Sequence, residues 1–124
     1  MAKPSLDVSV DQSNAFPVVL VRGELDVATI ETFNAATRRA GELGSAFVIV
    51  SFLESPYCDS TSIQALLRFR KQLDTRRQAL MLVVGSRGSP RRVFEVSGVT
   101  KLIPTFTSVE QAMCTARALG GSQL

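Results

Sequence analysis

The sequence predicts an α/β fold in which a mixed, mostly parallel sheet of about five strands, with the first strand antiparallel, packs against about four helices. Two short apolar stretches come first, each of strand length and joined by a polar turn. Further on, stretches of strand length alternate with longer ones whose apolar residues recur every three or four positions. The 124 residues suffice for one domain with a buried core, so we expect a single domain over 1–124.

The two opening strands are predicted from different patterns. Leu6, Val8 and Val10 alternate with polar residues, as in a half-exposed strand, whereas 18–21 is continuously apolar. The polar connection at 11–15 favours a hairpin, and the first strand is therefore expected to be antiparallel to the second.

A first helix is predicted after these strands, with Asp26 as its N-cap and Gly44 at its end. Its inward residues recur with helical spacing. They are Ile30, Phe33, Ala36, Ala40 and Leu43.

A buried strand is predicted over 47–53, and Pro56 helps to confine it to that length. The next helix is predicted over 60–77. Its apolar stripe consists of Ile63, Leu66, Leu67 and Leu73, and Arg68, Lys71 and Arg76 are expected to lie outside.

Two strands and two helices are predicted from the remaining sequence. Strands are expected over 79–84 and 102–105. Between them, Ser89 is the expected N-cap of a short helix, with Pro90 at its first position and Gly98 at its end.

The last helix is predicted to begin with a capping box made by Thr107 and Glu110. Val109, Ala112, Met113 and Ala116 form its apolar side, and Gly-Gly at 120–121 ends it in a short frayed tail.

Composition excludes several classes of function. Apolar residues make up 45% of the chain and charged residues 20%, as in ordinary soluble domains. Because the chain has no histidine, it lacks Ser-His and Cys-His nucleophile pairs and histidine zinc sites, and we expect neither an enzyme nor a bound metal or cofactor. No apolar run approaches the ~20 residues of a membrane span, and the first residues lack a signal-peptide pattern, so a cytoplasmic protein without membrane contact is expected.

The net charge of +3 comes from arginines that recur in pairs, at 38–39, 76–77 and 91–92. A basic surface can attract nucleic acid or an acidic protein face, but solvated helix faces are the preferred interpretation. With one tyrosine and no tryptophan, the composition gives poor support for an aromatic platform that stacks single-stranded nucleic acid, and direct nucleic-acid binding is not expected.

The two cysteines, Cys58 and Cys114, lie too far apart in sequence for a Cys-x-x-Cys redox motif. A thiol of lowered pKa at Cys58, or a regulatory disulfide between the two, stays open as an alternative. Two buried, reduced cysteines are the favoured state for a cytoplasmic protein.

The candidate site is the stretch Cys-Asp-Ser-Thr-Ser-Ile at 58–63, where a predicted strand gives way to a helix. The first N–H groups of a helix lack partners, and the helix dipole favours negative charge there. A phosphate added to a serine at this point would be stabilised by those donors. The simpler alternative is that Asp59 and Ser60 only cap the helix.

Four motifs in this order carry a family resemblance: Gly-Glu-Leu-Asp at 23–26, Asp-Ser-Thr at 59–61, Ser-Pro-Arg-Arg-Val-Phe-Glu-Val-Ser-Gly at 89–98 and Thr-Ser-Val-Glu-Gln-Ala at 107–112. Together they resemble the bacterial anti-sigma factor antagonists, which are single STAS domains. The resemblance covers nearly the whole chain.

The resemblance implies a phosphorylation switch. The acceptor would be Ser60, with Thr61 as second choice, and the partner would be an anti-sigma factor with serine kinase activity. The unphosphorylated form binds that partner and frees the sigma factor, and a serine phosphatase restores it. The residues implied in partner binding are Glu24, Asp26, Asp59, Ser60, Thr61 and Ser62.

The sequence departs from the family pattern at two positions. Ser62 replaces a common glycine, and Ser51 takes a strand-end position often held by aspartate. We expect Ser62 to add bulk and a hydroxyl where a partner would approach.

Other functions stay open. The strongest alternative is a STAS protein that acts as a scaffold without phosphorylation, or as a nucleotide-binding regulator, with redox control through Cys58 and Cys114. Because the chain has no Gly-rich phosphate loop, nucleotide binding would need another mode. A receiver domain would need an acidic pair where Asp11 is followed by Gln12. An exposed helix face beside the switch could also support a weak homodimer.

Overall fold

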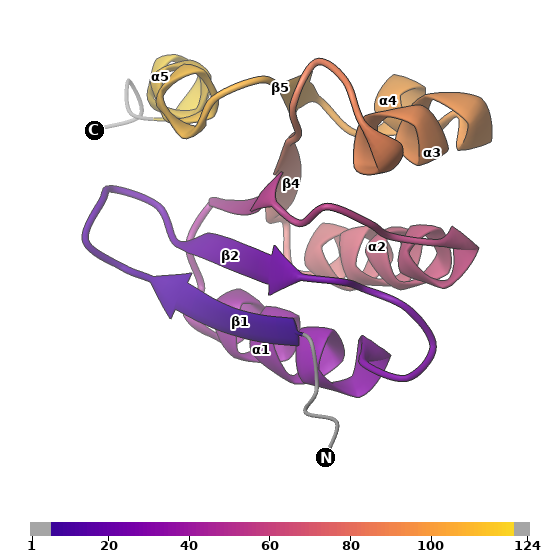
Figure 1. The fold of residues 1–124 in the computed structure, drawn as a ribbon. Coiled ribbons are helices and arrows are strands. Elements are labelled where there is room, and N and C mark those ends of the chain that lie inside the picture. Colours follow the sequence, from indigo (N-terminus) through magenta and orange to yellow (C-terminus); the bar gives the residue numbers. More distant parts are fainter. Residues whose placement is uncertain (1–5, 121–124) are drawn as a thin grey trace.

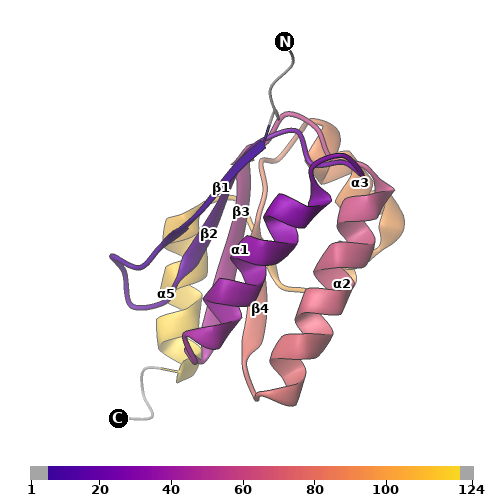
Figure 2. The ribbon, with the colours of Figure 1, turned by 90° about the horizontal axis from the view of Figure 1, so that it is seen from below.

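The computed structural model describes residues 6–120, which form a five-stranded sheet with helices on both faces (Figures 1 and 2). The strand order is β1-β2-β3-β4-β5. Strand β1 is antiparallel to β2, and the remaining pairs are parallel. The predicted mixed, mostly parallel sheet with an antiparallel first strand is confirmed.

The strands are β1 (Leu6–Asp11), β2 (Val18–Gly23), β3 (Phe47–Glu54), β4 (Ala79–Val83) and β5 (Thr105–Phe106). The helices are α1 (Ile30–Glu42), α2 (Ser60–Thr75), α3 (Ser89–Ser97), α4 (Val99–Leu102) and α5 (Val109–Gly120). The described part of the chain therefore has five helices where about four were expected, because the short α4 was not predicted.

Alternating side chains of β3 separate the core into two parts. Val48, Val50 and Phe52 pack on the face covered by α1 to α4, whereas Ile49 packs on the face covered by α5. Figure 2 shows α1 and α2 on one side of the strands and α5 on the other. Because both faces of β3 are covered, its sequence is a nearly continuous apolar run rather than an alternating one.

The first helix begins later than predicted. Its N-cap is Thr29, and the carboxylate of Asp26 instead accepts hydrogen bonds from the N–H groups of Ala28 and Thr29 in the preceding turn. Gly44, with φ of +77°, follows the end of the helix as expected. Leu43 is 47% exposed, so its assignment to the core was wrong.

The predicted strand over 102–105 was wrong at its start. Gly98, with φ of +85°, ends α3, and the chain turns directly into α4. Val99 and Ile103 are buried, which leaves Leu102 on the helix with 52% of its surface exposed. Strand β5 therefore begins only at Thr105.

Two predicted caps shift by one residue. Helix α3 has Gly88 as its N-cap, and Ser89 is already its first residue. At α5, the Ser108 hydroxyl accepts the N–H of Gln111, and the Gln111 amide oxygen accepts from the N–H and hydroxyl of Thr107, so Ser108 caps the helix and the predicted capping box of Thr107 and Glu110 does not form. The predicted end of α5 falls partly on Gly121, outside the described residues.

Candidate functional site

The loops that follow β2 and β3 are joined side by side. The N–H of Leu25 donates to the carbonyl of Tyr57 (3.0 Å), and the N–H of Asp59 donates to the carbonyl of Leu25 (3.3 Å). Leu25 and Cys58 form an isolated parallel bridge, and both side chains are fully buried. This pairing brings the Gly-Glu-Leu-Asp motif at 23–26 to the same edge of the sheet as the hydroxyl cluster at 60–62.

Ser55 reinforces this junction, although it was not identified from the sequence. Its hydroxyl donates to the carbonyl of Gly23 (2.7 Å) at the end of β2 and also lies 3.2 Å from the carbonyl of Tyr57. The side chain is 5% exposed. Ser51, by contrast, lies within β3, where its oxygen accepts from the N–H of Leu53 (3.4 Å) and does not reach the edge.

Asp59 is the N-cap of α2. Its backbone is extended, and its carboxylate accepts the N–H of Thr61 at 2.9 Å. Helix α2 therefore begins at Ser60, as predicted. The Asp59 carboxylate thus caps α2, and its negative charge lies at the N-terminal, positive end of the helix dipole.

The three hydroxyl residues that follow have different environments. Ser60 is exposed, and its side chain makes no hydrogen bond with any residue between 6 and 120. Thr61 is half-buried. Ser62 is 0% exposed, and its hydroxyl and N–H both donate to the carbonyl of Asp59. The structure therefore does not place Ser62 on the surface with Ser60, and the expected bulk of Ser62 points into the protein.

The two acidic residues of the 23–26 motif also differ. The Asp26 carboxylate accepts N–H groups of Ala28 (2.9 Å) and Thr29 (3.2 Å), while the Thr29 hydroxyl donates to the carbonyl of Glu24 (2.9 Å). Asp26 thus shapes the turn before α1 and is half-buried. Glu24 is exposed, so its carboxylate is the one presented to solvent.

Exposed apolar side chains lie in the same two loops. Val27 is 76% exposed in the loop after β2, and Tyr57 is 43% exposed in the loop after β3. Neither was singled out from the sequence, because loop residues belong to no strand or helix periodicity. The two loops that carry them are brought together by the pairing of Leu25 with residues 57–59.

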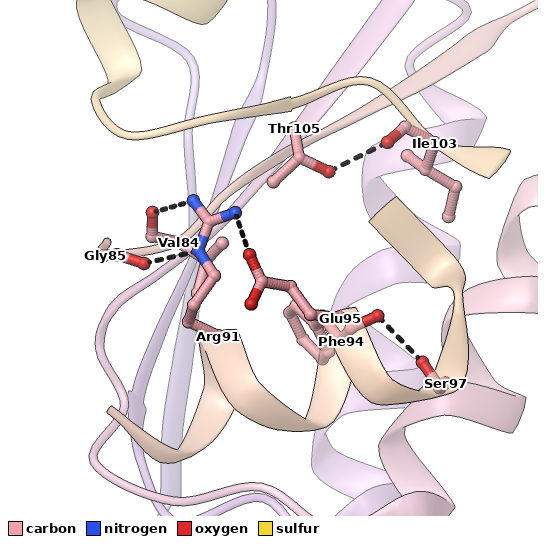
Figure 3. A network of polar contacts seen from close by, with 8 residues as sticks. All are labelled: Val84, Gly85, Arg91, Phe94, Glu95, Ser97, Ile103 and Thr105. Atoms are coloured by element: carbon pink, nitrogen blue, oxygen red, sulfur yellow. Dashed lines mark hydrogen bonds and ion pairs between the residues drawn. The ribbon is translucent and has the colours of Figure 1, made fainter. Parts of the chain in front are cut away.

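The loop after β4 is held by Arg91, as Figure 3 shows. The guanidinium of Arg91 donates to the carbonyls of Gly85 (2.9 Å) and Val84 (3.4 Å) and pairs with Glu95 (3.5 Å). The Arg91 side chain is 17% exposed, so it fastens α3 to the end of β4 and is not a solvated arginine. Arg92 is exposed, as expected.

The two cysteines are free and lie on different faces of the sheet. Cys58 packs in the core under α1 and α2, and Cys114 is exposed on α5, so the expectation that both are buried was wrong for Cys114. The pKa of the Cys58 thiol is raised to about 11, mainly because the thiol is buried; a hydrogen bond with Ser62 lowers the pKa in part, and the Asp59 charge adds to the increase. The structure therefore brings neither a disulfide nor a reactive thiolate to the site.

Residues 6–120 contain neither a cluster of metal-ligating side chains nor a membrane-spanning helix. No group of three or more cysteine, aspartate or glutamate side chains in this range is placed to hold a metal ion. None of its helices combines the length and apolarity that a membrane crossing requires.

A family model described as the STAS domain matches residues 7–112. No curated protein matches the chain significantly.

Several solved structures are similar. An anti-sigma factor antagonist from Mycobacterium paratuberculosis is 19% identical, with a TM-score of 0.84, over 94% of this chain and 99% of that one. SpoIIAA in its unphosphorylated form is 22% identical, with a TM-score of 0.72, over 90% of this chain and 97% of its own. Bacillus SpoIIAA in the phosphorylated form is 21% identical, with a TM-score of 0.66, over 90% and 100%. At these identities the likeness is one of fold.

Proposed function

The chain belongs to the STAS domain family, and on that premise we propose that it is an anti-sigma factor antagonist. In its unphosphorylated form it binds an anti-sigma factor with serine kinase activity and releases the sigma factor. Phosphorylation of Ser60 switches it off, and a serine phosphatase restores it. The observation that carries the proposal is the exposed, unengaged hydroxyl of Ser60 at the first residue of α2.

The environment of Ser60 suits a phosphate. Phosphorylation adds about −1.5 to −2 charges at neutral pH. The dipole of the long helix α2 favours that charge, whereas the Asp59 carboxylate beside it opposes it. Because the Ser60 side chain is exposed, the phosphate displaces no packed group, and the fold is expected to persist.

Thr61 stays the second choice for the acceptor, for a structural reason. It is half-buried, and its N–H is already bound by the Asp59 carboxylate. Ser60 is the more exposed of the two residues, so a kinase would reach its hydroxyl with less rearrangement of the helix start.

The partner surface that we propose surrounds Ser60. It combines the acidic residues Glu24 and Asp59 with the exposed apolar side chains Val27 and Tyr57. Asp26 contributes by holding the turn, and Ser62 supports the helix start from inside. Since a partner must desolvate this surface, a dianion at Ser60 would make binding costly without any change of fold.

The similar structures support the mechanism at the level of fold. SpoIIAA has been solved in unphosphorylated and phosphorylated forms, and this chain matches both. An antagonist of this type would act in the cytoplasm as a regulator and not as an enzyme, with ATP and Mg²⁺ supplied by the kinase. Redox control through Cys58 and Cys114 is the weaker alternative, because the two thiols lie on opposite faces of the sheet.

The test of the acceptor is phosphorylation by the cognate anti-sigma kinase, followed by mass-spectrometric mapping. We expect one phosphate per chain on Ser60, no labelling of Ser60→Ala and normal labelling of the matched control Thr61→Ala. Labelling that persists in Ser60→Ala would show that the acceptor is another residue.

The test of the switch is the affinity of Ser60→Glu for the same kinase, measured by calorimetry without ATP. We expect Ser60→Glu to bind at least about tenfold more weakly than wild type, which corresponds to about 1.4 kcal/mol. Ser60→Gln, which has a similar shape without charge, should bind nearly as well as wild type. Equal affinities of Ser60→Glu and wild type would contradict the off-switch.

A further inference from the structure

A groove lies at the end of α2 that is distant from Ser60. It opens beside β4, has a volume of about 230 Å³, and is lined mainly by apolar side chains. Its lining includes Phe47, Met81, Leu102 and Leu119, together with Arg70 and Asp74 of α2. We refer to it as the β4 groove.

The apolar rim of the β4 groove is exposed, and the part of it on α5 packs closely on the sheet. Leu102 on α4 is 52% exposed, and Leu119 on α5 is 60% exposed. The last turn of α5 is held against the sheet, because a Cβ atom added at Gly120 would lie 2.9 Å from the Phe47 ring. Two large apolar side chains on either side of one hollow indicate a contact surface, whereas single exposed leucines are ordinary.

The β4 groove carries one positive and one negative side chain, so its charges are complementary to those of a second copy of the same groove. Arg70 and Asp74 lie one turn apart on α2, and within residues 6–120 neither forms an ion pair. In a two-fold symmetric interface, residue i of one copy meets residue j of the other, and j meets i. A surface that carries one cation and one anion beside an apolar hollow matches a second copy of itself.

We propose that the β4 groove is the contact surface of a symmetric homodimer of this chain. Arg70 of each copy pairs with Asp74 of the other across antiparallel α2 helices, and Leu102 and Leu119 are covered. Residues 60 and 74 are separated by about 21 Å along α2. Both Ser60 sites therefore stay accessible in the dimer, and the inference does not rest on the proposed phosphorylation.

The test is sedimentation velocity of the full chain over a wide range of concentrations. Wild type is expected to shift from monomer to dimer as concentration rises. Arg70→Asp and Asp74→Arg each place like charges in contact and should raise the dimer dissociation constant at least about tenfold. The double variant R70D/D74R restores opposite charges and should return the constant to within about threefold of wild type.

Controls separate this contact from general effects of charge and folding. Arg68→Asp changes an exposed arginine of the same helix outside the groove, and it should dimerise as wild type does. Leu119→Ser should weaken the dimer, whereas Val96→Ser, at an 84% exposed position on α3, should not. Ser60→Glu should dimerise normally, so that failure of the dimer and failure of the switch are distinguishable.

Three results would overturn the proposal. The first is a chain that stays monomeric at every concentration. The second is a double charge reversal that dimerises no better than either single variant. The third is a dimer that forms only after removal of residues 121–124, which would mean that the end of the chain itself covers the groove.

Discussion

At the scale of single residues, helical phase decides which hydroxyl of the 60–62 cluster is exposed to solvent. Ser62, Ala65 and Phe69 are buried beside the predicted stripe of α2, so the inward face is wider than the four apolar residues first assigned to it. The start of the helix at Ser60 was predictable from the Asp-Ser pair. The burial of Ser62 was not, because a serine gives no apolar signal.

Cys58 provides a pH test at the residue scale. Burial raises its pKa from 9.0 to about 11, so the folded state holds the thiol proton in a range where the unfolded state has lost it. The free energy of unfolding should therefore fall as the pH rises from about 9 to about 11, by up to about 3 kcal/mol. Below about pH 8 this contribution should be constant.

Urea unfolding at several pH values measures this effect, with matched variants to isolate it. Cys58→Ala should lose this part of the alkaline slope, and Cys114→Ala, at an exposed position, should keep it. If wild type and Cys58→Ala show the same slope, the Cys58 thiol is not the group responsible.

At the scale of elements, Ser55 joins the ends of β2 and β3. Because Ser55→Ala removes the buried hydroxyl that donates to the Gly23 carbonyl, we expect a loss of about 1–3 kcal/mol in the free energy of unfolding. Urea denaturation measures this loss. Hydrogen exchange of the Leu25 and Asp59 amides should also become faster, since the two loops depend on this junction.

The control for Ser55→Ala is Ser86→Ala, at an exposed position in the loop after β4, which should change stability by no more than about 0.5 kcal/mol. An equal effect of the two variants would show that Ser55 does not hold the loops together.

The order and type of most elements could be predicted from the sequence, but several boundaries and the layout of the site could not. Thr107 and Ser108 are both good cap residue types, so the sequence alone does not decide between them, and in the structure the Ser108 hydroxyl accepts the N–H of Gln111. Leu102 was misassigned because Gly98 permits a second helical turn instead of ending the helical region. The approach of residues 23–26 to 59–61 depends on the pairing of Leu25 with a distant loop, which no local pattern encodes.

At the scale of the whole molecule, the proposed switch and the core are separate. The exposed Ser60 side chain makes no contact that the core requires, and the buried residues of α2 lie on its other face. Ser60→Glu should therefore leave the free energy of unfolding within about 0.5 kcal/mol of wild type.

Thermal and urea unfolding of Ser60→Glu check this separation. Ser62→Glu is the matched comparison, because it places the same charge at a fully buried position two residues away and should unfold the start of α2 or the whole chain. A large destabilisation by Ser60→Glu would mean that charge at this position acts through the fold and not through the partner surface.

The hydrogen bonds between Leu25 and the 57–59 loop run from main chain to main chain. The side chains of Glu24, Val27 and Tyr57 are exposed on this frame and take no part in those main-chain hydrogen bonds. They could thus be exchanged as a set, as in a grafted recognition loop, and the frame would still present its new side chains beside Ser60. For the proposed antagonist, partner choice would rest on these exposed side chains while main-chain atoms pair the two loops, which makes this end of the sheet a suitable starting point for redirecting the protein to another partner.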